Sequence, residues 1–346
     1  MNNIDEEFDV FYNSYKKIIE NNQKIEIVKI NKLRNKCIMG IAMLTIVILI
    51  LLIIFYDQNI VGYYYKIIIA VLCFIALIFL FIISIKILNK EKKKSCYLIN
   101  SILYYSILDF LCGGSYDFYP NTQISENDFN KMKLFNMDYL KYEGNNLTTV
   151  KYQNKKLVIC DVWLYDLVER IKTDSYYSKA TNTMYITNYH YHDRVDIFKG
   201  LYYETTINRE NNKYIYMIPN NFNDKFVQKN IYHYISYNGE KIDLENLEFS
   251  ERYSVFSFDE IKSRYVLSLT LMEKINKIDR LIDNKKYFVF KSDGRVGIFV
   301  DKFQLEKIFK KNFNINEKVS KDYINSFFIK IHRILDIAQN LEDINQ

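Results

Sequence analysis

Glycine and proline are scarce in this sequence, which has 9 glycines and 2 prolines among 346 residues. No glycine-rich dinucleotide-binding fingerprint occurs, and SDGRVG at residues 292–297 lacks the spacing of a phosphate-binding loop. The chain has no internal repeat and no low-complexity linker. Tyrosine (31) and phenylalanine (24) are abundant. This composition fits an AT-biased genome as well as it fits any functional cause.

The cysteines are few and scattered. They are 5 in number, at positions 37, 73, 96, 112 and 160. An odd, unclustered set argues against both a disulfide framework and a zinc ribbon. We therefore expect the main domain to lie in a reducing compartment.

The chain has only a small excess of positive charge, with a formal net charge of +6. That balance does not by itself indicate nucleic acid. The tyrosines could stack on bases, but no basic stripe accompanies them. We expect no nucleic-acid partner.

Two long runs contain no charged residue, at 37–56 and 67–85. Each is long enough to cross a hydrocarbon core of about 30 Å as a helix. A buried core helix of this length would rarely lack every polar interruption. A secretory signal peptide is disfavoured because the first run starts after residue 36 and a second run follows. The sequence predicts a transmembrane hairpin in a lipid bilayer.

Charged and aromatic residues around the hairpin predict its direction. The connecting loop, 57–66, has one lysine, and Tyr56 with the tyrosines at 63–65 could form an interfacial aromatic belt. Basic residues flank the other ends of both runs: Lys24, Lys29, Lys32, Arg34, Lys36, Lys86, Lys90, Lys92, Lys93 and Lys94. Basic residues mark the cytoplasmic side, so both termini should be cytoplasmic.

A basic cluster follows the second run and comprises Lys90, Lys92, Lys93 and Lys94. It would attract anionic lipid headgroups at about 1 kcal/mol per residue near the surface. The simpler interpretation, which we favour, is a topology signal without lipid specificity.

The first 36 residues read as an amphipathic helix. Its apolar stripe consists of Phe8, Phe11, Tyr15, Ile18 and Ile25, with Asn22 in one slot. We expect this helix to pack on its own soluble domain; a dimerisation helix, and so a homo-oligomer, is the alternative. The predicted organisation is a cytosolic helix (1–36), the hairpin (37–85), a juxtamembrane helix (86–114) and a cytosolic domain (115–346).

The rest of the chain predicts an α+β fold with a mainly antiparallel sheet and C-terminal helices. The juxtamembrane helix should end near Leu111, before Gly113-Gly114. Expected elements then follow in order: a helix at 125–134 capped by Ser125; strands at 147–153, 156–168, 184–192, 195–207 and 213–218; a helix from Ser257 to Val266; a stripe of Leu271, Ile275, Ile278 and Ile282; a hairpin at 287–300; and a helix at 319–341 with Ile324, Phe328, Ile331, Leu335 and Ala338 on one face.

The stretch YHYHDRVD, residues 189–196, places two histidines two residues apart. On a strand His190 and His192 share one face, opposite Tyr189 and Tyr191. That alternation is typical of a half-exposed antiparallel strand and explains the histidines without a metal. A metal site would need a third ligand.

His233 and Cys160 are the candidates for that third ligand, but nothing in the spacing brings either close. Cys160 lies in LVICDVW, which reads as a buried strand rather than as part of a catalytic pair. Asp259-Glu260 has an adequate explanation as a helix start. Gly200 within a strand predicts a bulge or a close backbone approach. No catalytic set and no cofactor site emerge.

Two phrases carry a resemblance: FKGLYY at Phe198–Tyr203, and EFSERYSVFSFDEIKSRYVLSLTLMEKI at Glu248–Ile275. With the leading helix and the hairpin, they make the chain resemble a bacterial family of two-span membrane proteins with a cytosolic domain of unknown function. The family tends to Thr-Pro where this chain has Ser268-Leu269, and residues 141–160 match poorly. The resemblance implies a multi-pass protein of the bacterial plasma membrane, and no activity.

These observations favour a membrane-anchored binding or scaffold module with an unknown protein partner, and enzymatic activity is not expected. An enzyme acting on a membrane-proximal or lipid substrate is the alternative, and it would need a perturbed carboxylate or histidine in a pocket. An accessory subunit of a membrane complex is the third possibility.

Overall fold

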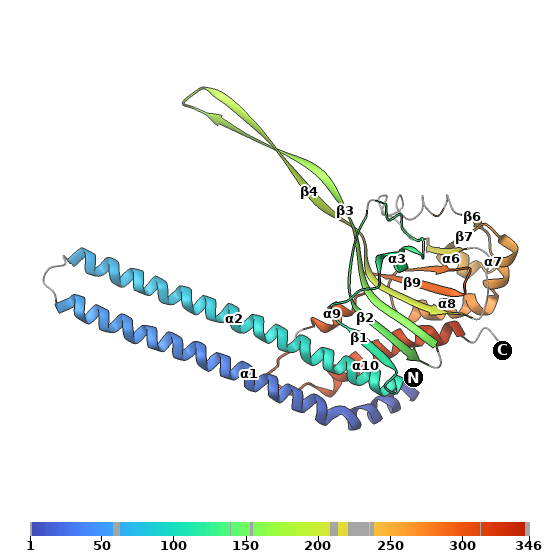
Figure 1. Ribbon diagram of the computed structural model, residues 1–346, viewed down its shortest axis with the longest axis horizontal. Coiled ribbons are helices and arrows are strands. Elements are labelled where there is room, and N and C mark those ends of the chain that lie inside the picture. The colour runs from blue at the N-terminus through green and yellow to red at the C-terminus, as the bar shows by residue number, and fades with distance from the viewer. Residues whose placement is uncertain are drawn as a thin grey trace. The chain divides into compact units, whose positions relative to one another are not determined.

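A computed structural model describes residues 2–57, 63–138, 140–152, 155–207, 214–220, 235, 239–311 and 313–342 (Figure 1). The chain divides into two compact units. The first comprises Met1–Ile107 with Ile308–Phe328, and the second comprises Leu108–Lys307 with Ile329–Gln346.

Two long helices carry both apolar runs. α1 spans Asn2–Asp57 and α2 spans Tyr63–Cys112. Both are long and apolar enough to cross a membrane, and their apolar windows are 0% buried. Of the loop predicted at 57–66, residues 58–62 lie outside the described residues, while 57 ends α1 and 63–66 begin α2. The side chains of Tyr56 and of the tyrosines at 63–65 also lie outside the description. α2 ends one residue after the predicted Leu111, and Gly113 and Gly114 follow with φ of 59° and 78°.

The buried stripe of α1 differs from the predicted one. Ile18 and Ile25 are 48% and 63% exposed, whereas the polar Gln23 and Glu26 are buried. Burying a polar group costs free energy unless it is hydrogen-bonded. Gln23 meets that condition: its Nε2 donates to Ile315 O at 3.1 Å, and its Oε1 accepts from Val319 N at 3.2 Å.

The first unit closes where α1 and α2 meet residues 308–328. The Phe11 and Phe328 rings stack with centroids 5.1 Å apart. On α2, Asn100 Nδ2 donates to Phe309 O at 2.8 Å. The N-terminal helix thus packs on a late segment of its own chain.

A nine-stranded sheet forms the second unit, in the order β1-β2-β3-β4-β9-β8-β5-β7-β6. All of the recorded strand pairs are antiparallel. The strands are β1 (Tyr116–Tyr119), β2 (Lys141–Tyr152), β3 (Lys155–Ser178), β4 (Thr183–Thr206), β5 (Ile215–Pro219), β6 (Glu240–Ile242), β7 (Tyr253–Ser257), β8 (Lys286–Phe290) and β9 (Arg295–Asp301). The predicted fold class is confirmed. β4 joins two strands that the sequence predicted as separate.

Four helices complete the described part of this unit: α3 (Glu126–Asn130), α6 (Leu247–Arg252), α7 (Glu260–Val266) and α8 (Leu269–Leu281). Two later helices, α9 (Leu305–Phe309) and α10 (Lys321–Glu342), each have residues in both units. The predicted stripe of α8 is buried from Leu271 to Ile282, as are the predicted residues of α10 apart from Ala338, whose side chain lies outside the description. An aromatic cluster packs near β9, where Phe129 and Phe135 each lie 5.6 Å from the Phe299 ring centroid.

One predicted helix start differs from the structure. The N-cap of α7 is Asp259, which accepts from Lys262 N at 3.1 Å. Ser257 cannot begin the helix because it still pairs with Ile215 in the sheet. Ser268 stands at the N-cap of α8, and its side chain makes no capping hydrogen bond.

Candidate functional site

A long two-stranded arm extends from the sheet of the second unit. β3 and β4 pair from Val158–Glu204 out to Ser178–Thr183, and Figure 1 shows them continuing as a ribbon beyond their neighbours. Among the described strands, β2 pairs with β3 only up to Tyr165 and β9 pairs with β4 only from Gly200. The arm, defined here as residues 165–178 and 183–196, therefore has two unpaired edges. At about 3.3 Å per residue it is about 45 Å long.

Both faces of the arm are exposed to solvent. The largest apolar and aromatic side chains gather near its tip: Tyr176 (60% exposed), Tyr177 (58%), Met184 (60%), Tyr185 (41%) and Ile186 (64%). The register pairs Tyr176 with Tyr185 on one face and Tyr177 with Met184 on the other. Tyr189 and Tyr191 are 52% and 45% exposed, so the predicted half-burial of this strand is wrong, although its antiparallel pairing is as expected.

The middle of the arm is held by polar side-chain contacts between its own strands. Arg170 Nε lies 2.9 Å from Asp193 Oδ2, and His190 Nδ1 lies 2.8 Å from Glu169 Oε1. His190 and His192 share a face, as predicted, because both alternate with the tyrosines. Among the described residues, no group of His, Cys, Asp and Glu could hold a metal. His233 lies outside the described residues.

At the base of the arm, an arginine is enclosed by aromatic rings. Arg194 Cζ lies 3.3 Å from the Trp163 ring centroid and 3.4 Å from that of Tyr165. The guanidinium also donates to Glu143 Oε2 at 3.2 Å, and Tyr165 Oη donates to the other oxygen of Glu143 at 2.7 Å. Cation–π contacts of this kind stabilise by about 0.5–1 kcal/mol at exposed sites. The register shift between Leu164 and Tyr165 lies in the same place.

Gly200 allows a close backbone approach rather than a bulge. A Cβ at this position would lie 2.1 Å from Val300 O, because β9 runs directly beside it. The register shift of β4 falls instead between Asp196 and Phe198. The Val300 carbonyl fills the space beside Gly200.

Cys160 and Asp161 lie side by side in β3 and are both buried. Burial raises the pKa of the Cys160 thiol to about 12, so the thiol is inert at neutral pH. The Asp161 carboxylate accepts from Leu305 N and Glu306 N, both at 2.7 Å, and so caps α9. Burial outweighs these hydrogen bonds and raises the pKa of Asp161 to about 6.

A second buried polar group lies beside a cavity of about 590 Å³. Lys286 Nζ, with a side chain 1% exposed, is 3.1 Å from Asp279 Oδ1, and Tyr253 Oη donates to the same carboxylate at 2.6 Å. Lys286 also donates to Asn284 O at 3.0 Å and to Ile282 O. Because these carbonyls close the end of α8, the ammonium acts as a helix C-cap. Desolvation lowers the pKa of Lys286.

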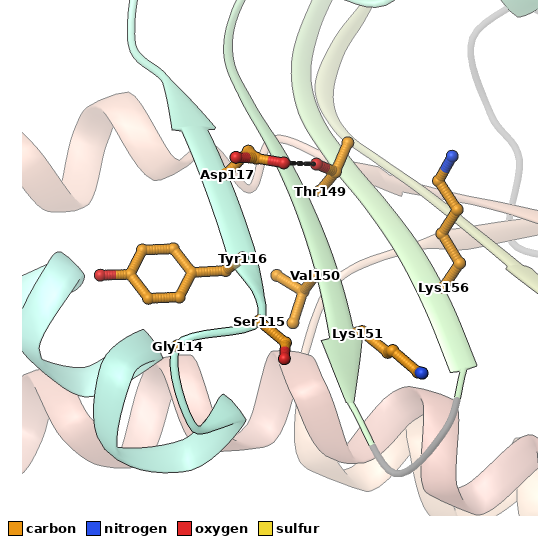
Figure 2. Close-up of a pocket in the computed structure, with 8 residues that line it drawn as sticks. All are labelled: Gly114, Ser115, Tyr116, Asp117, Thr149, Val150, Lys151 and Lys156. Atoms are coloured by element: carbon orange, nitrogen blue, oxygen red, sulfur yellow. Dashed lines mark hydrogen bonds between the residues drawn. The ribbon is translucent and has the colours of Figure 1, made fainter.

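Figure 2 shows a shallow pocket of about 460 Å³ along β1 and β2. Thr149 Oγ1 donates to Asp117 Oδ2 at 3.4 Å across the two strands. Tyr116, Lys151 and Lys156 point in different directions (Figure 2). Without convergent polar groups, this pocket offers no catalytic arrangement.

The four lysines of the basic cluster lie on α2. Lys90, Lys93 and Lys94 are exposed, and Lys92 is half-buried. Their contact with lipid stays a prediction. Sequence reasoning did not find the arm, the Arg194 cluster or the cap on α9. Only the unusual length of alternating sequence at 184–207 could have indicated the arm.

The chain thus combines an antiparallel-sheet domain with two long apolar helices. The family described as "Protein of unknown function (DUF3137)" matches residues 196–342. No curated protein and no solved structure matches the chain. The matched segment contains both phrases on which the resemblance rests and begins where β4 re-enters the sheet. Similarity to an uncharacterised domain family is therefore found, while the bacterial and two-span parts of the resemblance stay predictions.

Proposed function

We propose that this protein is a membrane-anchored binding module whose β3–β4 arm captures another protein by strand pairing. α1 and α2 cross a bacterial plasma membrane once each, and both termini are cytoplasmic. The α+β unit is then a cytosolic domain that carries the arm.

Exposure of the apolar helices supports the anchoring. Core helices of soluble proteins bury their apolar residues, whereas the apolar windows here are 0% buried. A long contiguous apolar surface marks a site of contact with a membrane or with another protein. The basic residues at the outer ends of both runs support the cytoplasmic position of the termini.

The observation that carries the binding function is the uncovered arm. A two-stranded hairpin alone is marginally stable in water, and unpaired edges are templates for a further strand. Its tip exposes Ile186 and Met184 by 64% and 60%, which a partner could cover. Strand addition would satisfy the open backbone groups while pockets on the partner receive the side chains.

A protein partner fits the arm better than a lipid interior does. Inserting the arm into hydrocarbon would leave the backbone groups of both edges without partners, and each such group costs several kcal/mol. A partner strand supplies those partners.

Site-specific photocrosslinking in the native membrane tests this proposal. A photoreactive residue at Ile186 of the arm should give one adduct of defined mass with a protein. The same residue at Ile261 of α7, which is 83% exposed, should not. Replacing Tyr177 and Met184 together by serine should reduce the Ile186 adduct at least about tenfold, because this cross-strand pair forms much of the apolar tip, and apolar anchors contribute most of a contact.

Equal labelling from Ile186 and Ile261, or adducts with lipid alone, would contradict the binding role of the arm. Release of the protein from the membrane by alkaline carbonate would contradict the anchoring.

A further inference from the structure

A cavity of about 370 Å³ lies between α1 and α2 within the first unit. Its α1 side presents Lys29, Lys32 and Lys36, and its α2 side presents Ile87 and Glu91. Pockets that hold small ligands have volumes of about 300–1,000 Å³. The cavity is therefore large enough for the polar part of a lipid.

The cavity lies at the edge of the apolar helices. Lys36 immediately precedes the apolar run at 37–56, and Ile87 follows the run that ends at residue 85. At 1.5 Å per residue, Lys29 lies about 10 Å from Lys36 along the helix. The headgroup layer on each side of a bilayer is roughly 5–8 Å thick. If the runs span the membrane, the cavity opens at headgroup depth.

The charges in the cavity are only partly compensated. Glu26 is buried, accepts from Ser95 Oγ, and lies 3.6 Å from Lys29 Nζ. In contrast, within the part of the chain that the structure describes, Lys32 and Lys36 form no ion pair. They lie closest to the apolar run, and Glu91 lies one helical turn farther out than Ile87.

We propose that this cavity binds the headgroup of a membrane phospholipid. The phosphate of this lipid lies against Lys32 and Lys36. A terminal hydrogen-bond donor of the headgroup, such as an ammonium or a hydroxyl, faces Glu91. The proposal rests on the membrane anchoring proposed above. A free phosphate fits less well, because it would lie near the Glu91 carboxylate and would leave Ile87 without an acyl chain.

Native mass spectrometry of the full-length protein tests this site. The protein is extracted in detergent, and phosphatidylethanolamine, phosphatidylglycerol and phosphatidylcholine are added separately at equal concentration. One lipid should remain bound at fixed stoichiometry for the first two, and much less for phosphatidylcholine, whose choline group has no N–H or O–H donor. Lys32→Gln with Lys36→Gln should reduce retention about tenfold or more.

Lys93→Gln with Lys94→Gln is the matched control, because it removes the same charge from exposed positions outside the cavity. It should retain lipid as the wild type does. Equal loss in both variants would show diffuse attraction to basic residues and overturn the site. Unchanged retention in the Lys32/Lys36 variant, or displacement of the lipid by millimolar inorganic phosphate, would also overturn it. None of these lipid-binding results depends on the arm or on its protein adduct. The lipid site can therefore be disproved while the proposed binding role of the arm stands, and the reverse also holds.

Discussion

Replacement of Asp161 by asparagine should change how the stability of the protein depends on pH. The carboxylate is 1% exposed and accepts from Leu305 N, Glu306 N and Asn146 Nδ2 at 2.7, 2.7 and 2.8 Å. Burial disfavours the charged form, and the three donors favour it. Burial is the larger effect, so the pKa rises from 3.8 to about 6.

The sign of the effect follows from this shift. The folded protein holds the Asp161 proton more tightly than the unfolded chain does. The resulting stabilisation is fully present below pH 3.8 and is lost as the pH rises through about 6. A shift of roughly two pKa units corresponds to about 3 kcal/mol. Asparagine binds no proton, so the stability of the variant relative to the wild type should rise by about 2 kcal/mol between pH 4 and pH 7, which is most of that range.

Urea unfolding of the full-length protein in detergent measures this difference. Trp163 is the single tryptophan of the chain and lies two residues from Asp161, so its fluorescence reports the local unfolding. Asn146→Gly removes one donor at a position with φ of 57°, and it should steepen the pH dependence of the wild-type carboxylate. If the free energy of unfolding of Asp161→Asn relative to the wild type stays constant or falls as the pH rises, the reasoning is falsified, because the hydrogen-bond donors would then outweigh burial.

Two further substitutions probe the sheet and the base of the arm. Gly200→Ala should destabilise the protein by more than about 2 kcal/mol, since the new Cβ would lie 2.1 Å from Val300 O. Gly40→Ala is the control, because nothing lies within 4 Å of a Cβ at Gly40. Trp163 fluorescence in urea compares the two variants, and similar unfolding midpoints would refute the close approach at Gly200. Arg194→Lys keeps the charge but loses the planar contact with two rings, so it should cost about 1 kcal/mol. Circular dichroism can follow that change in a Trp163→Leu background as well, and an undiminished cost there would show that the ring of Trp163 contributes nothing.

Elements with local signals could be predicted from the sequence. The end of α2 follows from two glycines, the buried face of α8 from its helical spacing, and the β8–β9 hairpin from Gly294, which has φ of 75°. In each case the residues that determine the structure lie within a few positions of one another. The cap of α7 was misplaced by two residues because Ser257 has the sequence form of a cap but belongs to a strand.

Features that depend on distant residues could not be predicted. Gln23 and Glu26 are buried in α1 because Gln23 reaches backbone groups near residue 315 and Glu26 meets Ser95. The cap on α9 comes from Asp161, 144 residues earlier in the chain. The arm was not predicted because alternation of polar and apolar residues normally indicates a strand with one buried face. In this structure no described element covers either face of the arm.

The base of the arm shows how a marginal ribbon can be held in place. The register shift at Leu164/Tyr165 is where a two-stranded ribbon would bend most easily, since a bulge interrupts the ladder. At the same place Arg194 joins the rings of β3 to Glu143 of β2. A short distance farther into the sheet, Gly200 lets β9 close tightly against β4. These contacts join the arm to β2 and β9, the strands on either side of it in the sheet. Under the proposed binding function, an arm anchored at its base in this way would lose less conformational entropy on binding than a flexible loop would.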